Sequence, residues 1–324
     1  MVKWGVLGTA NVASWGCIPG MLKANNCELY AIAGRSAEKV EQYKQKFGFE
    51  VGYVGYDKLL EDPAVQAVYI PLPNHIHKEW VIKALKAGKN VLCEKPMALN
   101  AQESEEMYAA AKENNVILME AYAYLHGQFM ESLKKDIESG VIGDIVYIDT
   151  AFVTQGYKED FRLHKEFGGG MIYDLGCYCT TMMLSLIDSE VEYAKACAEM
   201  TDLGVDSFVG GLIKFKNGAR ASFNAGMILG ENTNSRFDRL FIHGTKGNIR
   251  SEYEYNQSGE TSYRIIKDGE TLVKVIPTDN NYQLEVEQLG RCIENGEKPH
   301  ISPEFSIKNA KLLDALLDEV GFWK

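Results

Sequence analysis

The sequence has no excess of positive charge, no long apolar run and few histidines, and each shortage excludes a class of function. Its 34 Lys and Arg residues stand against 45 Asp and Glu, which gives a formal net charge of -11. Because no basic stripe is present, nucleic acid and anionic membranes are not expected partners. No apolar run is long enough to span a bilayer. The six histidines form no set with acidic residues at metal-ligand spacing, so we expect no metal.

Cysteine usage and the amino terminus indicate a cytoplasmic protein. The seven cysteines are an odd number, and the one close pair, Cys177 and Cys179, lies two positions apart on a predicted helix where side chains diverge. Reduced thiols that pack in the core fit this pattern better than disulfides or zinc. From Met1 the sequence passes straight into a predicted strand, without the charged, apolar and cleavage segments of a secretion signal.

The first part of the chain alternates short apolar runs with longer helical stretches, which is typical of βαβ units and a parallel sheet. The runs predicted as strands are residues 3–7, 29–33, 67–70, 90–93 and 116–119. We therefore expect an α/β Rossmann domain, with a doubly wound parallel sheet, over residues 1–121.

The pattern of the chain after residue 121 differs, because long β-rich runs are separated by turn signals such as Lys216-Asn217-Gly218. The predicted strands are residues 144–154, 191–201, 207–215, 219–227 and 239–243, and the predicted helices are residues 128–139, 174–187, 282–295 and 303–320. Such runs favour an antiparallel sheet. The second domain, over residues 122–324, is therefore expected to be α+β.

A glycine turn follows the first predicted strand. The segment Gly8-Thr9-Ala10-Asn11-Val12 lies between that strand and the first helix, where a dinucleotide fingerprint belongs. Gly8 would make the tight turn, and amide groups at the helix start would meet a pyrophosphate. Ala10 occupies the usual second glycine position, so the fingerprint is imperfect, and a simple packing turn is the alternative.

The end of the second strand indicates which dinucleotide binds. Gly34-Arg35-Ser36 stands where an NAD enzyme places an acidic residue for the ribose hydroxyls. Arg35 and Ser36, with Lys39 one helical turn later, suit a 2′-phosphate instead, so NADP is favoured. NAD remains possible because an arginine can also stack on adenine. The alternative interpretation is a solvated arginine followed by a serine helix cap.

The tripeptide Glu94-Lys95-Pro96 follows the buried run Val91-Leu92-Cys93 directly. It therefore lies at the carboxyl end of a parallel strand, where ligands bind in doubly wound sheets. Pro96 keeps Lys95 out of the α region, which fixes the direction of the side chain. A lysine aimed into a cleft is a candidate catalytic charge.

Asp174 and Tyr178 are predicted on one face of a helix that follows Gly168-Gly169-Gly170. A tyrosine ordinarily ionises at about pH 10, and an adjacent ammonium would favour its phenolate. In this hypothesis Tyr178 takes the hydroxyl proton of an alcohol whose carbon passes a hydride to nicotinamide. Lys95 lowers the pKa of the tyrosine and binds the substrate oxygen, while Asp174 orients the substrate or Lys95. The alternative is a helix start with a first-turn acid and a half-buried tyrosine.

A short helix start lies near the end of the third predicted strand. Leu72, Pro73 and Asn74 are expected to contact the cofactor, with Asn74 also a plausible helix cap. His77 lies close to the end of the strand and is a candidate ligand of substrate or nicotinamide. His75 is expected to face solvent.

Together these residues resemble the Gfo/Idh/MocA oxidoreductase family over nearly the whole chain. The marks are the glycine turn, Pro-Asn-x-x-His at 73–77, Glu-Lys-Pro at 94–96 and Gly-Gly-Gly-x-x-x-Asp-x-Gly at 168–176. The resemblance implies a Rossmann domain joined to a domain with a large, open, mainly antiparallel sheet. Many members carry histidine where this chain has Tyr178. In having a tyrosine at this position, the chain resembles the branch of the family that contains dihydrodiol dehydrogenase, glucose-fructose oxidoreductase and NADP-linked D-xylose dehydrogenase.

That branch implies an NADP-dependent dehydrogenase of a sugar or diol, with Tyr178 as acid/base and Lys95 as its partner. It also implies that Glu94 belongs to the cofactor site and that the open sheet joins two subunits in a homodimer. Phe161-Arg162-Leu163 is similar to an arginine segment near the active site there, so Arg162 is a candidate substrate contact. Further candidates for the pocket lining are Tyr124, His126, Tyr157, Phe237 and Tyr282.

Three other functions keep the same fold. One is a cofactor-sensing regulatory protein that has lost the chemistry, and the joint presence of Lys95, Asp174 and Tyr178 argues against it. Another is a reductase of dicarbonyls or keto-sugars. In the third, the bound cofactor is recycled within one turnover, as in glucose-fructose oxidoreductase.

Overall fold

The computed structural model describes residues 1–324 except 157–159, 230–235, 253 and 324. The chain divides into two compact units: unit 1 comprises Met1–His126 with Asn280–Ile307, and unit 2 comprises Gly127–Asp279 with Lys308–Lys324. The predicted division at residue 121 therefore differs from the compact units, each of which is built from two segments of chain. The reason is that α9 (Asn281–Asn295) packs against α2 (Cys17–Lys23) and the first two strands.

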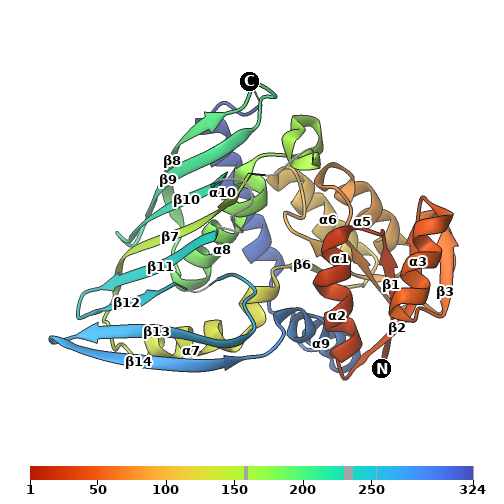
Figure 1. Cartoon of the computed structure of the whole chain (residues 1–324), viewed down its shortest axis with the longest axis horizontal. Coiled ribbons are helices and arrows are strands. Elements are labelled where there is room, and N and C mark those ends of the chain that lie inside the picture. Colours follow the sequence, from red (N-terminus) through yellow and green to blue (C-terminus); the bar gives the residue numbers. More distant parts are fainter. Residues whose placement is uncertain (157–159, 230–235, 253, 324) are drawn as a thin grey trace. The chain divides into compact units, whose positions relative to one another are not determined.

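Unit 1 is built on a six-stranded sheet in which every pairing is parallel (Figure 1). The strand order is β3-β2-β1-β4-β5-β6. This is the order of a dinucleotide-binding sheet, with its topological switch point between β1 and β4. The strands are β1 (Val2–Leu7), β2 (Cys27–Gly34), β3 (Val51–Val54), β4 (Ala67–Ile70), β5 (Asn90–Glu94) and β6 (Leu118–Ala121). The predicted doubly wound α/β domain is confirmed.

Helices cover both faces of this sheet. Beside α2 and α9 they are α1 (Asn11–Trp15), α3 (Ala37–Phe47), α4 (Tyr56–Glu61), α5 (His77–Lys86) and α6 (Ala101–Glu113). Two 3₁₀ turns, η1 (Asn74–Ile76) and η2 (Ala123–His126), lie after β4 and β6. α10 (Pro303–Glu319) begins in the last residues of unit 1 and continues in unit 2.

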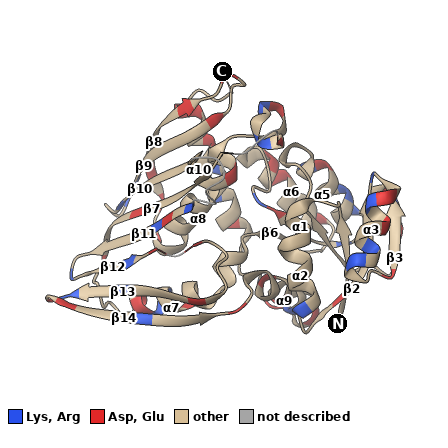
Figure 2. Cartoon of the chain, in the orientation of Figure 1, with Lys and Arg blue, Asp and Glu red and all other residues tan. Residues whose placement is uncertain are grey.

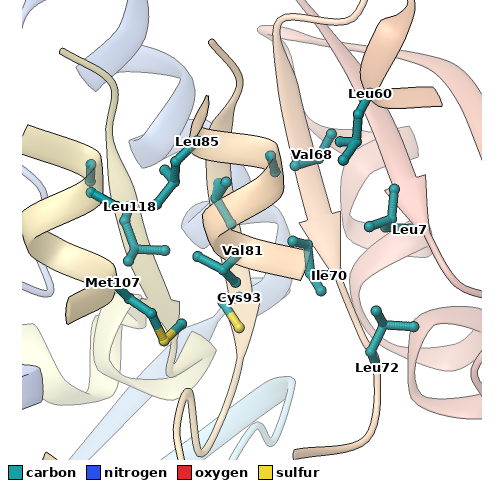
Figure 3. Packing of buried hydrophobic residues seen from close by; sticks show 14 of the residues in the cluster. Leu7, Leu60, Val68, Ile70, Leu72, Val81, Leu85, Cys93, Met107 and Leu118 are labelled. Carbon is teal, nitrogen blue, oxygen red and sulfur yellow. The ribbon is translucent and has the colours of Figure 1, made fainter. Parts of the chain in front are cut away.

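One apolar core of unit 1 lies between the sheet and helices α4, α5 and α6 (Figure 3). Val81 and Leu85 from α5 meet Ile70 of β4, Cys93 of β5 and Met107 of α6, all fully buried. Each such side chain contributes about 1.5 to 3 kcal/mol by burial. This packing holds the carboxyl ends of β4 and β5 in place.

Unit 2 is built on an eight-stranded mixed sheet in the order β14-β13-β12-β11-β7-β10-β9-β8. Only β7 and β10 pair in parallel among its described pairings, and the others are antiparallel. The expected large, mainly antiparallel sheet is confirmed. Its strands are β7 (Ile145–Gln155), β8 (Val191–Met200), β9 (Asp206–Phe215), β10 (Arg220–Leu229), β11 (Arg236–Gly244), β12 (Asn248–Ser251), β13 (Gly259–Lys267) and β14 (Glu270–Thr278).

The helices of unit 2 include α8 (Cys177–Leu186), which packs on β7 and β10, and α7 (Gln128–Glu138), which packs on β14. Two 3₁₀ turns, η3 (Phe161–Leu163) and η4 (Lys165–Phe167), precede the triple glycine. The predicted helix over 174–187 begins earlier and with a wider turn, because residues Ile172–Gly176 form a π-helix, η5, ahead of α8. Single π turns of this kind occur frequently at functional sites.

The surface charge is mixed. Figure 2 shows Lys and Arg interspersed with Asp and Glu on α3, whose sequence alternates both signs. None of the helices in the described part of the chain is both long and apolar enough to cross a membrane.

Candidate active site

The turn after β1 has the shape that the glycine fingerprint predicts. Gly8 has a φ of +139°, a backbone conformation that favours glycine, and a Cβ there would lie 3.1 Å from the Leu72 side chain, which would have to shift slightly. Ala10 precedes α1 with a methyl side chain that cannot cap the helix. The first amides of α1 are therefore available to an anion, which suits the pyrophosphate of a dinucleotide.

Arg35 and Ser36 follow β2 directly and are both exposed. The Ser36 side chain accepts a hydrogen bond from the Lys39 amide at 3.4 Å, so the helix-cap interpretation of this serine is also realised. Burial raises the pKa of Tyr56, and the charge of Arg35 and its hydrogen bond to Tyr56 partly oppose that rise. The Tyr56 ring in turn packs edge-on against Trp80, with centroids 4.9 Å apart. Arg35 thus stands beside an aromatic pair at the edge of the sheet.

Three buried side chains hold the segment that carries Lys95. The Tyr69 hydroxyl donates to Glu94 Oε1 at 2.5 Å. His77 Nδ1 lies 3.1 Å from the Pro96 carbonyl oxygen, and the Met97 amide donates to Glu120 Oε1 at 2.9 Å. The Lys95–Pro96 peptide bond is cis. Lys95 is half-buried at the carboxyl end of β5, on a segment fixed from β4, α5 and β6.

His77 does not have the geometry of a ligand-binding histidine. It is fully buried, and its second ring nitrogen, Nε2, lies 2.6 Å from the Leu72 carbonyl oxygen. Burial lowers the pKa of His77 to about 4, although both carbonyls favour the charged ring. Because both nitrogens face protein carbonyls, the expectation that His77 contacts substrate or nicotinamide is not supported. Its role is to join the loop after β4 to the Glu94-Lys95-Pro96 segment, while His75 is exposed as expected.

Glu120 is a buried acid whose protonation is coupled to Lys95. Burial raises the pKa of Glu120 to about 7, and hydrogen bonds from Ser306, Met97 and Tyr122 and the Lys95 charge oppose that rise. The residue is 4 % exposed. A carboxyl with a pKa near neutrality that interacts with the candidate catalytic lysine is a candidate functional group.

In unit 2, the triple glycine lets the chain approach the arginine loop closely. A Cβ at Gly169 would lie 2.3 Å from the Arg162 carbonyl oxygen, so only glycine fits. The Gly170 amide donates to the same oxygen at 2.8 Å. Arg162 Nε donates to Asp174 Oδ2 at 2.7 Å, and its Nη1 donates to Asp160 at 3.0 Å. Arg162 and Asp174, both predicted site residues, therefore form an ion pair, with Asp160 as a third member.

Tyr178 lies on α8 in a cluster of three aromatic rings. Its ring centroid lies 5.4 Å from that of Phe152 on β7 and 5.1 Å from that of Tyr255. Phe152 and Tyr255 stack at 5.2 Å with an interplanar angle of 13°. Tyr178 is half-buried, while Phe152 and Tyr255 are buried. The rings fix the direction of the phenol and shield it partly from water.

The other predicted pocket residues lie in varied surroundings. Phe237 is 47 % exposed and packs against Arg239, on the face of β11 opposite Asp238, so it does not join the Tyr178 cluster. Tyr124 is fully buried in unit 1, and the rings of His126 and His300 are 4.9 Å apart. Tyr282 is half-buried and meets the edge of Trp15. Tyr157 lies outside the described residues.

Sequence reasoning does not identify several residues that support the site. Tyr69, Glu120 and Asp206 are buried polar groups with partners distant in sequence; Asp206 Oδ2 accepts from the Ile172 amide at 2.7 Å at the start of η5. Burial raises the pKa of Asp206 to about 6. A signal is present for Glu120, since a carboxylate in the apolar strand β6 is costly to bury without a function.

Comparison with known proteins agrees with this architecture. Residues 2–122 match the model of the oxidoreductase family with an NAD-binding Rossmann fold, and residues 130–250 match the GFO/IDH/MocA C-terminal domain. The chain is 30% identical, over its whole length and 99% of the relative, to an oxidoreductase of Rhizobium meliloti. It is 28% identical to D-xylose 1-dehydrogenase (NADP(+)) 2 of Haloferax volcanii, covering 98% of this chain and 97% of that protein.

A solved structure is similar over the same extent. KijD10, a 3-ketoreductase from Actinomadura kijaniata in complex with NADP and TDP-benzene, superposes with a TM-score of 0.92 at 26% identity, covering 98% of each chain. Models of both family domains and a full-length relative thus match this chain. The chain belongs to the Gfo/Idh/MocA oxidoreductase family.

Proposed function

We propose that the protein is an NADP-dependent oxidoreductase that transfers a hydride between nicotinamide and the CH–OH carbon of a sugar or diol. The relatives named D-xylose 1-dehydrogenase (NADP(+)) 2 and trans-1,2-dihydrobenzene-1,2-diol dehydrogenase support this substrate class. The observation that carries the proposal is Tyr178, a half-buried phenol in an aromatic cluster four residues after the ion-paired Asp174.

The cofactor site proposed for this chain follows the carboxyl edge of the unit 1 sheet. The turn at Gly8 and the amides of α1 fit a pyrophosphate, and Arg35 fits a 2′-phosphate because its guanidinium is exposed at the end of β2. When bound, the nicotinamide supplies or accepts the hydride. The residues proposed to hold the cofactor are Gly8, Thr9, Ala10, Asn11, Val12, Arg35, Ser36, Lys39, Leu72, Pro73, Asn74, Glu94 and Lys95.

Tyr178 acts in this proposal as the acid/base. In the oxidative direction it accepts the hydroxyl proton of the substrate, and in the reductive direction it returns that proton to the new alkoxide oxygen. Lys95 provides the positive charge that stabilises the phenolate and the substrate oxygen. Asp174, held by Arg162, is the hydrogen-bond acceptor that orients a substrate hydroxyl.

The test is a rate assay with NADP⁺ or NAD⁺ and a panel of aldoses, polyols and trans-diols, following absorbance of the reduced nicotinamide. Tyr178→Phe should lower kcat by about 10²- to 10⁴-fold with cofactor affinity nearly unchanged. Tyr193→Phe, on the exposed side of β8, is the matched control and should keep full activity. Unchanged turnover in Tyr178→Phe would remove this residue from the mechanism.

A second set of variants tests whether Lys95 and Tyr178 serve one proton transfer. If they do, the Lys95→Ala and Tyr178→Phe losses in kcat are not multiplicative, and the double variant is little slower than the worse single variant. Fully multiplicative losses would assign the two residues to separate steps.

Similarity to a 3-ketoreductase favours reduction as the second candidate activity. The same panel is therefore run in reverse, with NADPH and the corresponding keto-sugars and dicarbonyls. A kcat/KM for a keto-sugar that exceeds every oxidative value would identify the reductase as the better description.

A further inference from the structure

Arg236 on β11 lies against the aromatic cluster that holds Tyr178. Its guanidinium carbon is 4.3 Å from the ring centroid of Phe152, on the strand paired with β11. Phe152 is the ring that also meets Tyr178 and stacks on Tyr255. The arginine and the proposed acid/base therefore share one aromatic neighbour.

Asp238 fixes this arginine. Its carboxylate accepts from Arg236 Nε at 2.9 Å and from Nη2 at 2.5 Å, and it also accepts from the Tyr255 amide at 3.0 Å. Arg236 Nη2 further donates to the Tyr255 carbonyl oxygen at 3.1 Å. A guanidinium held by a carboxylate and by a backbone carbonyl has little freedom to turn away. The Asp238 carboxylate is itself buried.

The charge of Arg236 interacts with Tyr178. Burial lowers the pKa of Arg236, but the hydrogen bond and charge of Asp238 outweigh it, and Glu254 and Tyr178 add to the net rise. Coupling between two titrating groups is reciprocal, so a cation that is stabilised by the phenolate also stabilises the phenolate.

We propose that Arg236 is a positioning residue for the reaction: held by Asp238 and stacked on Phe152, it fixes the Tyr178 ring and favours its ionised form. The inference rests on the proposed role of Tyr178. Arg236 adds a positive charge from unit 2 itself, and it acts through Phe152 and through space.

Several titratable groups face this pair, and the Tyr255 phenol, with its ring centroid 5.1 Å from that of Tyr178, is one of them. Asp238 and Glu254 face Arg236. On the helix side of Tyr178, Asp174 is paired with Arg162, and burial raises the pKa of the Cys179 thiol. Burial raises the pKa of Asp238 and the charge of Arg236 lowers it, so removal of Arg236 changes the protonation of Asp238 as well as the charge beside Tyr178.

The experiment is the pH dependence of kcat in the oxidative direction between about pH 6 and pH 10, the range below the ordinary pKa of a phenol. Arg236→Met should move the midpoint of the rising limb upward by about one pH unit, because a fixed positive charge near the phenol is lost. Arg236→Lys should move it by about half as much, since the charge remains without the planar stack.

Arg239→Met is the matched control. Arg239 lies three residues further along β11, on the opposite face, with Nε 2.7 Å from Asp149 and its guanidinium over Phe237. Its removal should leave the midpoint unchanged. Arg236→Met should unfold at a lower denaturant concentration than wild type, because Asp238 loses its partner, and a cooperative transition at each pH establishes that the variant is folded under the assay conditions.

Two results would overturn the inference. One is an Arg236→Met variant whose kcat falls at every pH with no shift of the midpoint, which would make the arginine merely structural. The other is an Arg239→Met shift as large as that of Arg236→Met. Tyr178→Phe distinguishes failure of the Arg236 inference from failure of the proposed function. If Tyr178→Phe keeps the wild-type pH profile of kcat, the acid/base role of Tyr178 itself is wrong.

Discussion

The buried imidazole of His77 gives the sharpest prediction for stability. We consider His77→Gln, which replaces a titrating ring by an amide that does not titrate. In the folded protein the pKa of His77 lies at about 4, because the ring is fully buried, against an ordinary value of 6.5. A lowered pKa means that the folded state holds the neutral ring and resists protonation.

The sign and size of the effect follow from this difference. The neutral His77 contributes stability that is fully present above pH 6.5 and is lost as the pH falls through 4. Over that interval the loss amounts to about 3 kcal/mol, since one pKa unit corresponds to about 1.4 kcal/mol. The glutamine side chain of the variant has no such dependence. Near neutral pH the variant should be less stable by about 1 to 2 kcal/mol, because the neutral ring donates one hydrogen bond to a carbonyl and a flexible amide fits the fully buried site less well.

The assay is urea denaturation at several pH values from neutrality down to about 4, the folded-state pKa, followed by tryptophan fluorescence. Trp4, Trp15 and Trp80 belong to the same unit as His77 and report on it. The difference in unfolding free energy between wild type and His77→Gln should shrink by about 3 kcal/mol, and reverse sign, across this range. His75→Gln is the matched control, because His75 is exposed two residues away. Stability curves of wild type and His77→Gln that stay parallel throughout would refute the reasoning.

Two further predictions concern unit 1. Arg35→Ala should raise the KM for NADP⁺ by about 10- to 100-fold and that for NAD⁺ much less, because the charge of the lost guanidinium pairs with the 2′-phosphate while its stacking on adenine contributes to both cofactors; equal losses for both would contradict this assignment. Glu120 has the opposite sign to His77: its raised pKa contributes stability present below pH 4.5 that is lost as the pH rises through about 7. The unfolding free energy of Glu120→Gln relative to that of wild type should therefore increase by about 3 kcal/mol from pH 4.5 to about pH 7. The same denaturation series measures it. A difference that stays constant with pH would show that this carboxyl is ionised throughout the interval.

Much of the fold can be predicted because local patterns determine it. The alternation of apolar runs and helices predicts five of the six strands in the parallel sheet, and the one it omits, β3 (Val51–Val54), is a four-residue edge strand with alternating exposure. The hairpin of β13 and β14 is also absent from the predicted strands. Its turn, Asp268-Gly269, has positive φ at both residues and is a recognisable two-residue signal.

The site is less predictable because its supporting contacts join distant parts of the chain. Arg162 and Asp174 are both identifiable from sequence, but their ion pair depends on the close approach that Gly169 permits. From the sequence His77 is a candidate ligand near the end of a strand, and only the fold reveals that two carbonyls enclose it. No propensity rule places a π-helix at Ile172–Gly176, since a sequence pattern does not distinguish it from the first turn of α8.

The division of each unit into two chain segments has a consequence for biosynthesis. Unit 1 ends with residues Asn280–Ile307, so α9, which covers β1 and β2, is made only after all strands of unit 2. While Gly127–Asp279 is synthesised, the face of β1 and β2 that α9 contacts in the folded protein stays uncovered. A fragment ending at His126 would keep that face exposed and should aggregate instead of folding as an independent cofactor-binding domain. Synthesis of unit 1 thus begins with the first residues of the chain and ends only at residue 307, close to the carboxyl terminus.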